Sequence, residues 1–220
     1  MTFYRNRIFP VLSGVLWVVF LFLDITRKAD STPVKFAAIC LCCATALLGA
    51  KTTDGRLVAA ALCFTVAADW FLLVLNDYYL IGVGLFLIVQ FLYAVRLSHS
   101  QEKGSFRWWL WVRVDITLLF LFAGEILFYL FRGYGLLLLL PLFYFSNLCI
   151  NTFEAFALKR RTFAAGLLLF VCCDICVGAW NLGFISGFIR VGMWLFYLPS
   201  QVLIVLSQEP KKEVSDEKTV

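Results

Sequence analysis

Eight long runs of apolar residues fill most of this chain of 220 residues. Each run covers about 18–24 residues, and an α-helix of that length crosses a hydrocarbon core of about 30 Å. The runs are continuous rather than alternating, so they exclude a membrane β-barrel. We expect helices over Ile8–Ile25, Pro33–Ala50, Leu57–Leu75, Tyr78–Leu97, Val112–Phe131, Leu136–Leu158, Thr162–Trp180 and Phe184–Ser207.

The composition excludes an ordinary soluble domain. Hydrophobic residues make up 62% of the chain and charged residues 15%, against about 45–50% and about 25% in soluble domains. The sequence therefore predicts an all-α, polytopic membrane protein whose eight transmembrane helices lie within residues 1–207. Residues 208–220 are polar and of mixed charge, and we expect a disordered cytoplasmic tail there.

The basic residues predict the orientation of the helices. With eight spans both termini lie on one side of the membrane, and that side then carries 14 of the 19 Lys and Arg residues. Because cytoplasmic loops are enriched in Lys and Arg, we expect both termini in the cytoplasm. We expect the membrane to be a bacterial inner membrane rather than an intracellular membrane. The opposite side carries Arg27, Lys28, Lys35, Arg132 and Arg190. Topology accounts for the net charge of +5, so no nucleic-acid partner is expected.

Two of the expected helices resemble each other around an acidic residue. The third contains AALCFTVAAD, ending at Asp69, and the seventh contains AGLLLFVCCD, ending at Asp174. Asn76 and Asn181 each follow their acid by seven residues. Each acid lies about 18 Å into its span, at similar depth in the outer half of the membrane. This pattern predicts a parallel internal repeat of four plus four helices, with chance similarity of apolar segments as the alternative.

Asp69 and Asp174 are the candidate catalytic residues. A charged side chain inside a bilayer is costly, so it faces the protein interior or a water-filled cavity. Two carboxyl groups at matched depth are suited to acid and base catalysis. The alternative is that each carboxyl group only forms hydrogen bonds to neighbouring helices.

A second set of polar residues follows one face of the sixth expected helix. Tyr144, Asn147, Asn151 and Glu154 have the 3-4-3 spacing that places side chains on one helical face. That face points into the bundle, either as hydrogen-bonding contacts between helices or as part of a site.

Further polar residues enter the apolar runs elsewhere. Gln90 and Gln201 add polarity to the interior, and Lys35 and Arg190 enter their helices from the predicted outer side. Both cations have two interpretations: the side chain extends to the membrane interface, or it binds a phosphate.

Metal chemistry based on several histidines is excluded because His99 is the only histidine. The sequence contains no G-x-S-x-G, P-loop or H-E-x-x-H motif. We therefore expect no metal ion and no cofactor.

Several short motifs resemble the YhhN / lysoplasmalogenase family of eight-helix membrane proteins. The segment AADWFLLVLNDYYLIGVGLFLIVQFLYAVRL and the segment AGLLLFVCCD match the surroundings of the family's two acids. Three positions depart from the family pattern: Gln90 stands where His is common, Phe36 where Pro is usual, and Cys173 where Ser is usual. The matching positions are Lys35, Asp69, Tyr93, Pro141, Tyr144, Gly166, Phe170, Asp174, Tyr197 and Gln201.

The resemblance implies hydrolysis of the vinyl ether bond of lysoplasmalogens. The products would be a fatty aldehyde and a glycerophospho-ethanolamine or -choline, and the partners would be single-chain lipids and the surrounding membrane lipids. Asp69 and Asp174 would carry the catalysis. The residues implied to bind the substrate are Lys35, Gln90, Tyr93, Tyr144, Asn147, Asn181, Tyr197 and Gln201.

The chemistry of a vinyl ether suits a pair of carboxyl groups. Acid cleaves this bond: a proton adds to the alkenyl carbon, and water then adds to the resulting oxocarbenium ion. One carboxyl group must be protonated, and a second, ionised one must activate the water. The same residues also fit a small proton- or cation-coupled transporter, or a lipid-binding protein that kept the fold and lost the activity.

The orientation is open to a direct test. Reporter fusions at Lys103 and at Val220 are both expected on the cytoplasmic side, because basic residues concentrate there. A C-terminal reporter on the opposite side would show that the number of spans is odd.

Overall fold

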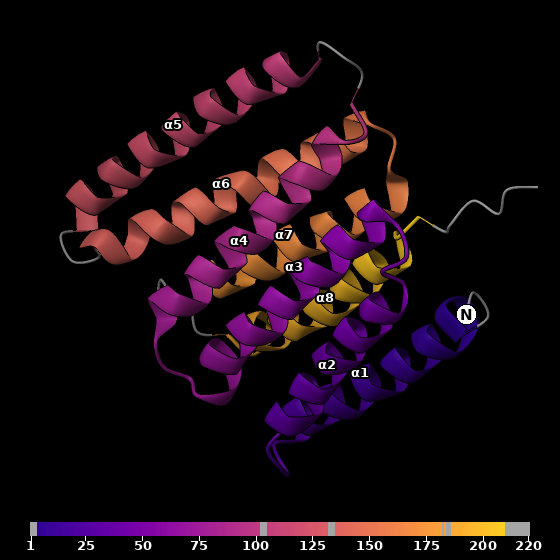
Figure 1. Ribbon diagram of the computed structural model, residues 1–220. Helices are drawn as coiled ribbons and strands as arrows, with labels where there is room; N and C mark the ends of the chain where they lie inside the picture. Colours follow the sequence, from indigo (N-terminus) through magenta and orange to yellow (C-terminus); the bar gives the residue numbers. More distant parts are fainter. Residues whose placement is uncertain (1–3, 102–104, 132–134, 182, 184–185, 210–220) are drawn as a thin grey trace, which may run out of the picture.

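The computed structural model describes residues 4–101, 105–131, 135–181, 183 and 186–209. Within these ranges the chain forms α-helices and two short π-helical segments, which confirms the all-α prediction (Figure 1). The eight α-helices are α1 (Phe9–Thr26), α2 (Thr32–Leu48), α3 (Thr53–Asp69), α4 (Tyr79–Ser98), α5 (Ser105–Phe131), α6 (Gly135–Ala157), α7 (Arg161–Asn181) and α8 (Gly187–Leu206).

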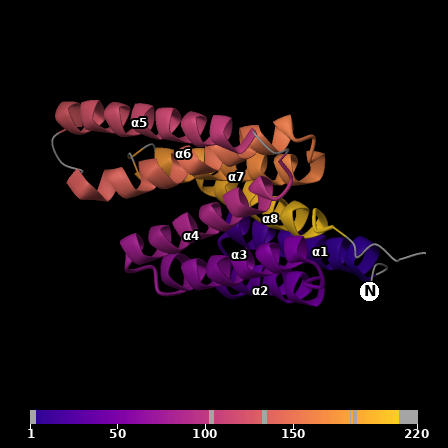
Figure 2. The ribbon, with the colours of Figure 1, turned by 45° about the horizontal axis from the view of Figure 1, so that its top comes forward.

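Seven of these helices form a closed ring. Neighbouring pairs pack in the order α1, α2, α3, α4, α6, α7 and α8, and α8 packs back against α1. Helix α5 lies outside the ring, at the edge of the bundle, and packs mainly on α6 (Figure 2). The helices that carry the two candidate acids, α3 and α7, are not neighbours in the ring.

Helix boundaries differ from the prediction by more than four residues at two places. The third helix keeps its α-helical geometry only to Asp69, and a π-helical turn, Trp70–Val74, continues it. Helix α5 begins at Ser105 rather than at Val112. No proline or glycine interrupts residues 105–123, so the helix includes Trp108 and Trp109. The predicted helix omitted both residues because it began at the start of the apolar run.

The outside of the bundle is rich in apolar side chains, as expected of helices that face lipid. Large apolar side chains point outward, including Phe91, Leu119 and Phe153, which are 67%, 64% and 75% exposed. Among the described residues, five helices are long and apolar enough to cross a membrane, and α2, with 17 residues, is slightly shorter. The fold is that of a multi-pass membrane protein.

A buried ion pair joins four parts of the chain at the end of the bundle where residues 4 and 209 both lie. Asp54, at the start of α3, accepts two hydrogen bonds from Arg96 of α4, at 2.7 and 2.9 Å. Arg96 also donates to the hydroxyl and carbonyl oxygens of Ser207, and Arg160 donates to Asp54 at 2.9 Å. Because Arg96 is 1% exposed, its charge depends on these partners.

A second polar contact attaches α5 to α6 on the same side of the bundle. Arg113 of α5 pairs with Glu154 and donates to the amide oxygen of Asn151 at 2.8 Å. Gln101 also donates to Glu154. Asn151 and Glu154, two residues of the predicted polar face of the sixth helix, therefore connect α6 to α5.

The packed structure extends beyond the predicted end of the helical domain. Gln208 is 2% exposed, and its amide donates to the carbonyl oxygens of Ala46 and Gly55 at 3.0 and 3.1 Å. Residues 210–220, the rest of the predicted tail, lie outside the described residues.

Removing the acid of the Asp54–Arg96 pair should destabilise the fold strongly. We expect Asp54→Asn to lower the free energy of unfolding by about 3–5 kcal/mol, because it leaves the buried Arg96 charge without a counter-ion. Glu209→Gln is the matched control, since Glu209 is exposed and its pair with Arg160 contributes about 0–1 kcal/mol. Denaturant unfolding in detergent micelles measures both values, and equal losses would contradict the role given to Arg96.

Candidate functional site

Asp69 receives a hydrogen bond from across the ring. It is the last residue of α3 and is 5% exposed. The hydroxyl of Tyr197, on α8, donates to its Oδ2 atom at 2.8 Å. Since α3 and α8 are not neighbours in the ring, this contact lies in the interior of the bundle.

Asp174 has a matching partner from a different helix. It lies in α7 and is half-buried. The hydroxyl of Tyr144, on α6, donates to its Oδ2 atom at 2.6 Å. Each candidate acid is thus held by one buried tyrosine.

A cluster of aromatic rings joins the two carboxyl–tyrosine pairs. Phe170 of α7 packs against the ring of Tyr197, with centroids 5.5 Å apart, and against Tyr144 at 6.5 Å. Phe86 of α4 contacts both tyrosine rings as well, at 5.9 and 6.5 Å. The thiol of Cys173 lies close to both carboxyl groups. The tyrosine partners of the two acids therefore pack on one aromatic cluster.

The backbone changes geometry directly after Asp69. Residues Trp70–Val74 form a π-helical turn, in which the amide of Leu75 donates to the carbonyl of Trp70 at 2.9 Å. Single π-helical turns inside α-helices occur often at functional sites, because they reorient side chains and leave backbone groups less regularly paired. The change from α-helical to π-helical geometry therefore occurs directly beside the candidate acid.

Lys35 lies at the opposite end of the same aromatic system. Its ammonium group forms an ion pair with Asp24 of α1 at 2.8 Å and lies 4.8 Å from the centroid of Trp194. Trp194 in turn packs edge-on against Tyr197, with centroids 5.2 Å apart. Lys35 is therefore linked to Asp69 through two aromatic rings.

Three other predicted residues lie deep in the bundle, closer to the end where the termini lie. Gln90, Tyr93 and Gln201 are each 0% exposed. Gln90 accepts hydrogen bonds from the amide of Asn151 through its side-chain and backbone oxygens, at 3.0 and 2.9 Å. Among the described residues, the Tyr93 hydroxyl and both polar atoms of the Gln201 amide have no hydrogen-bond partner. Buried polar groups of this kind are normally satisfied by water or a ligand.

Three asparagines named from the sequence form no hydrogen bond with either acid among the described residues. Asn147 donates to the carbonyl of Phe143 in its own helix, at 2.9 Å. Asn181 is exposed at the end of α7, close to the hydroxyl of Tyr79. Asn76 is also exposed and has a φ of 49°, the left-handed conformation that asparagine tolerates where a helix ends.

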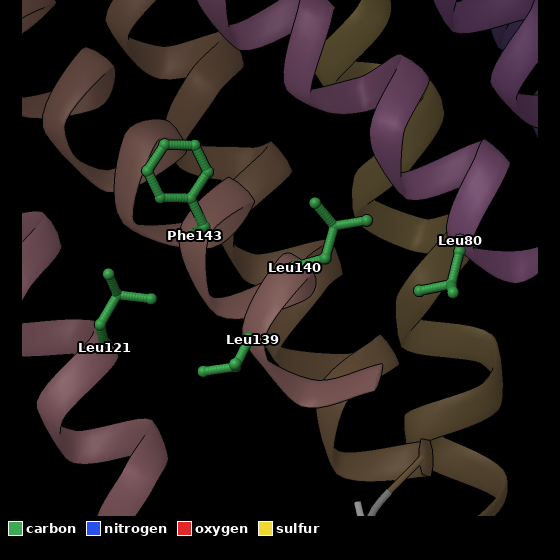
Figure 3. Close-up of a pocket in the computed structure, with 5 residues that line it drawn as sticks. All are labelled: Leu80, Leu121, Leu139, Leu140 and Phe143. Atoms are coloured by element: carbon green, nitrogen blue, oxygen red, sulfur yellow. The ribbon is translucent and has the colours of Figure 1, made fainter. Parts of the chain in front are cut away.

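An apolar groove is lined by residues of three helices. Its volume is about 350 Å³, and it is lined by side chains of α4, α5 and α6 (Figure 3). Phe143 precedes Tyr144 in α6, and neither Tyr144 nor Asp174 lines the groove. The lining residues are Leu80, Leu121, Leu139, Leu140 and Phe143.

The fold and the site define a multi-pass α-helical membrane protein with a pair of interior carboxyl groups. The chain belongs to the YhhN family: the sequence model of that family matches residues 31–208. Comparison with curated proteins and with solved structures gave no match. The predicted resemblance is confirmed.

Sequence reasoning missed two residues that the geometry brings to the site. Asp24 is the counter-ion of Lys35, and Trp194 connects Lys35 to Tyr197. Asp24 could have been found from the sequence, since it is an acid within the last turn of the first apolar run. Trp194 carries no such signal, because tryptophan is common in membrane helices.

The two carboxyl–tyrosine pairs should behave as separate hydrogen bonds. In a double-mutant cycle, Tyr197→Phe and Asp69→Ala should couple by about 0.6 kcal/mol, the average value for a hydrogen bond inside a membrane protein. The crossed cycle, Tyr197→Phe with Asp174→Ala, is the control and should give a coupling near zero. Unfolding free energies in detergent measure both cycles, and equal coupling would refute the pairing.

Proposed function

We propose that this protein is an integral-membrane hydrolase that cleaves the vinyl ether bond of lysoplasmalogen-type lipids. The observation that carries the proposal is the pair of interior acids, Asp69 and Asp174, each held by a tyrosine and both packed on one aromatic cluster. Membership of the YhhN family supports a lysoplasmalogenase-like role at the level of the family. The products are a fatty aldehyde and a glycerophospho-ethanolamine or -choline.

The reaction begins with proton transfer to carbon. One carboxyl group of the pair gives its proton to the outer alkenyl carbon, and the π electrons of the double bond form the new C–H bond. The adjacent carbon and its oxygen become an oxocarbenium ion. The donor is left as a carboxylate, whose negative charge lies beside the cation and stabilises it.

Water then completes the cleavage. The second carboxylate takes a proton from water while the water oxygen bonds to the cationic carbon, which gives a hemiacetal. This carboxyl group returns the proton to the glycerol oxygen as the C–O bond breaks. The first carboxylate accepts the hydroxyl proton, the aldehyde forms, and both acids regain their starting states.

The hydroxyls of Tyr144 and Tyr197 hold the acids in place during these steps. Each occupies one oxygen of its carboxyl group, at 2.6 and 2.8 Å, and leaves the other oxygen available for proton transfer. The rings fill the space between the acids with apolar surface, which limits the access of water to the cation. These contacts support the assignment of both tyrosines to the substrate site.

The alkenyl chain would lie in the groove between α4 and α6. That groove is lined by apolar side chains, among them Phe143, which directly precedes Tyr144, and this lining supports its assignment to the alkenyl chain. Gln90, Tyr93 and Gln201 lie deeper and would hold water for the reaction, since their unpaired polar atoms need partners. Both termini are proposed to face the cytoplasm of a bacterial cell.

Replacing either acid should abolish the reaction while preserving the fold. Asp69→Asn and Asp174→Asn are each expected to reduce aldehyde release from a lysoplasmalogen at least 100-fold, because acid and base catalysis contribute about 10²–10⁴-fold. Asparagine retains the acceptor for the tyrosine hydroxyl, so the melting temperatures should change little. Aldehyde production by the purified protein in lipid nanodiscs measures the effect.

Asp77→Asn is the matched control, because Asp77 is an exposed acid just beyond the π-helical turn after Asp69. Its turnover should equal that of the unaltered protein. Normal turnover in either Asp69→Asn or Asp174→Asn would eliminate the two-acid mechanism. Substrate-dependent proton flux in liposomes without aldehyde release would favour a transporter, and lipid binding without either would favour a non-catalytic member of the fold.

A further inference from the structure

A charged cluster lies at the end of the bundle opposite the termini. Lys35 of α2 pairs with Asp24 of α1, whose carboxylate also accepts a hydrogen bond from Ser31 at 2.5 Å. Arg190 of α8 donates to the backbone carbonyl of Asp24 at 3.0 Å. Three helices thus meet around one carboxylate and two cations.

The two cations are only partly satisfied by this arrangement. Lys35 and Arg190 lie close enough for their charges to interact, and the carboxylates of Asp24 and Asp30 both interact with Lys35. Arg190 reaches Asp24 only through its backbone oxygen, and its Nε atom is buried without a partner among the described residues. A positive charge and a buried donor therefore remain for an anion.

The position of the cluster is unusual for basic residues. The side of the membrane that we predict to be outer carries five of the 19 Lys and Arg residues, and four of these lie in or next to the cluster: Arg27, Lys28, Lys35 and Arg190. With Asp24 and Asp30, these residues leave a net charge of +2. Basic residues are generally depleted on that side, so a local concentration suggests a local anionic ligand.

The cluster connects directly with the pair of candidate acids. The ammonium group of Lys35 lies on Trp194, Trp194 packs on Tyr197, and Tyr197 donates to Asp69. A lysophospholipid carries its phosphate and its ether-linked chain on opposite ends of one glycerol. An anion held at Lys35 and Arg190 would therefore leave the ether bond pointing toward Asp69.

We propose that Lys35 and Arg190 form the binding site for the phosphate ester of the lipid headgroup, and that Asp24 occupies this site when no lipid is bound. The proposal rests on the proposed function for the identity of the lipid. The phosphate replaces the Asp24 carboxylate on Lys35 and engages the free donor of Arg190. Asp24 thereby competes with the ligand, so its removal should strengthen binding.

The test measures lipid affinity rather than cleavage. A saturated 1-O-alkyl glycerophosphocholine, which has no vinyl ether to hydrolyse, is compared with the 1-O-alkyl glycerol of equal chain length, which lacks the phosphate. Dissociation constants are measured by titration of the full-length protein in nanodiscs. The unaltered protein should bind the phosphate-bearing lipid at least tenfold more tightly.

Variants of the cluster should move the affinity in opposite directions. Lys35→Gln and Arg190→Gln should each weaken binding of the phosphate-bearing lipid about tenfold and leave the alkyl glycerol unaffected, whereas Lys35→Arg should retain binding. Asp24→Asn should strengthen binding of the phosphate-bearing lipid about threefold or more. Arg56→Gln and Asp77→Asn are the controls at exposed positions outside the cluster and should change it less than twofold.

Several outcomes would overturn the proposal. They are equal losses for both lipids in Lys35→Gln, weaker binding in Asp24→Asn, or effects of the same size in the exposed controls. Displacement of the lipid by millimolar inorganic phosphate would assign the site to free phosphate instead of a headgroup. Since no cleavage is measured, binding that follows the proposal without aldehyde release from lysoplasmalogens would remove only the proposed reaction.

Discussion

The arrangement of this bundle depends on the cost of burying polar side chains without partners. In an apolar interior that cost is several kcal/mol for each group, whereas lipid drives no association of apolar faces. Contacts such as Arg96 with Asp54 and Asn151 with Gln90 therefore determine which helices pack together. Apolar residues such as Phe153 are left to face outward, where the bilayer accepts them.

The same constraint separates the polar groups that support the fold from those proposed to act on a substrate. Arg96 donates four of its five N–H groups to Asp54 and Ser207, so its charge is already paired within the protein. Asp69 and Asp174 instead each receive one tyrosine hydroxyl, and a carboxyl group has further acceptor positions. Incomplete pairing at an enclosed position is the property expected of a reactive site.

The sequence predicted the helices and the two acids because both follow from one-dimensional patterns. Apolar runs mark spans, and an acid within a run is costly wherever the helix packs. The pairing of Tyr197 with Asp69, and of Tyr144 with Asp174, depends on which helices adjoin in the ring, and periodicity within one helix carries no such information. The internal repeat stays a prediction. If the two halves of the chain correspond, α3 matches α7 and α4 matches α8. Asp69 of α3 receives its hydrogen bond from α8, so the matching partner of Asp174 would come from α4, whereas it comes from α6.

The two acids occupy unlike surroundings, and this difference suits the proposed reaction. Asp69 is 5% exposed at the junction of an α-helix and a π-helical turn, whereas Asp174 lies within α7 and is the more exposed of the two. A reaction that needs one proton donor and one base requires groups that are not equivalent. The tyrosine partners also come from different helices, α8 for Asp69 and α6 for Asp174. Two carboxyl groups of the same chemical type can thereby take different roles in the proposed reaction, because the fold surrounds them differently.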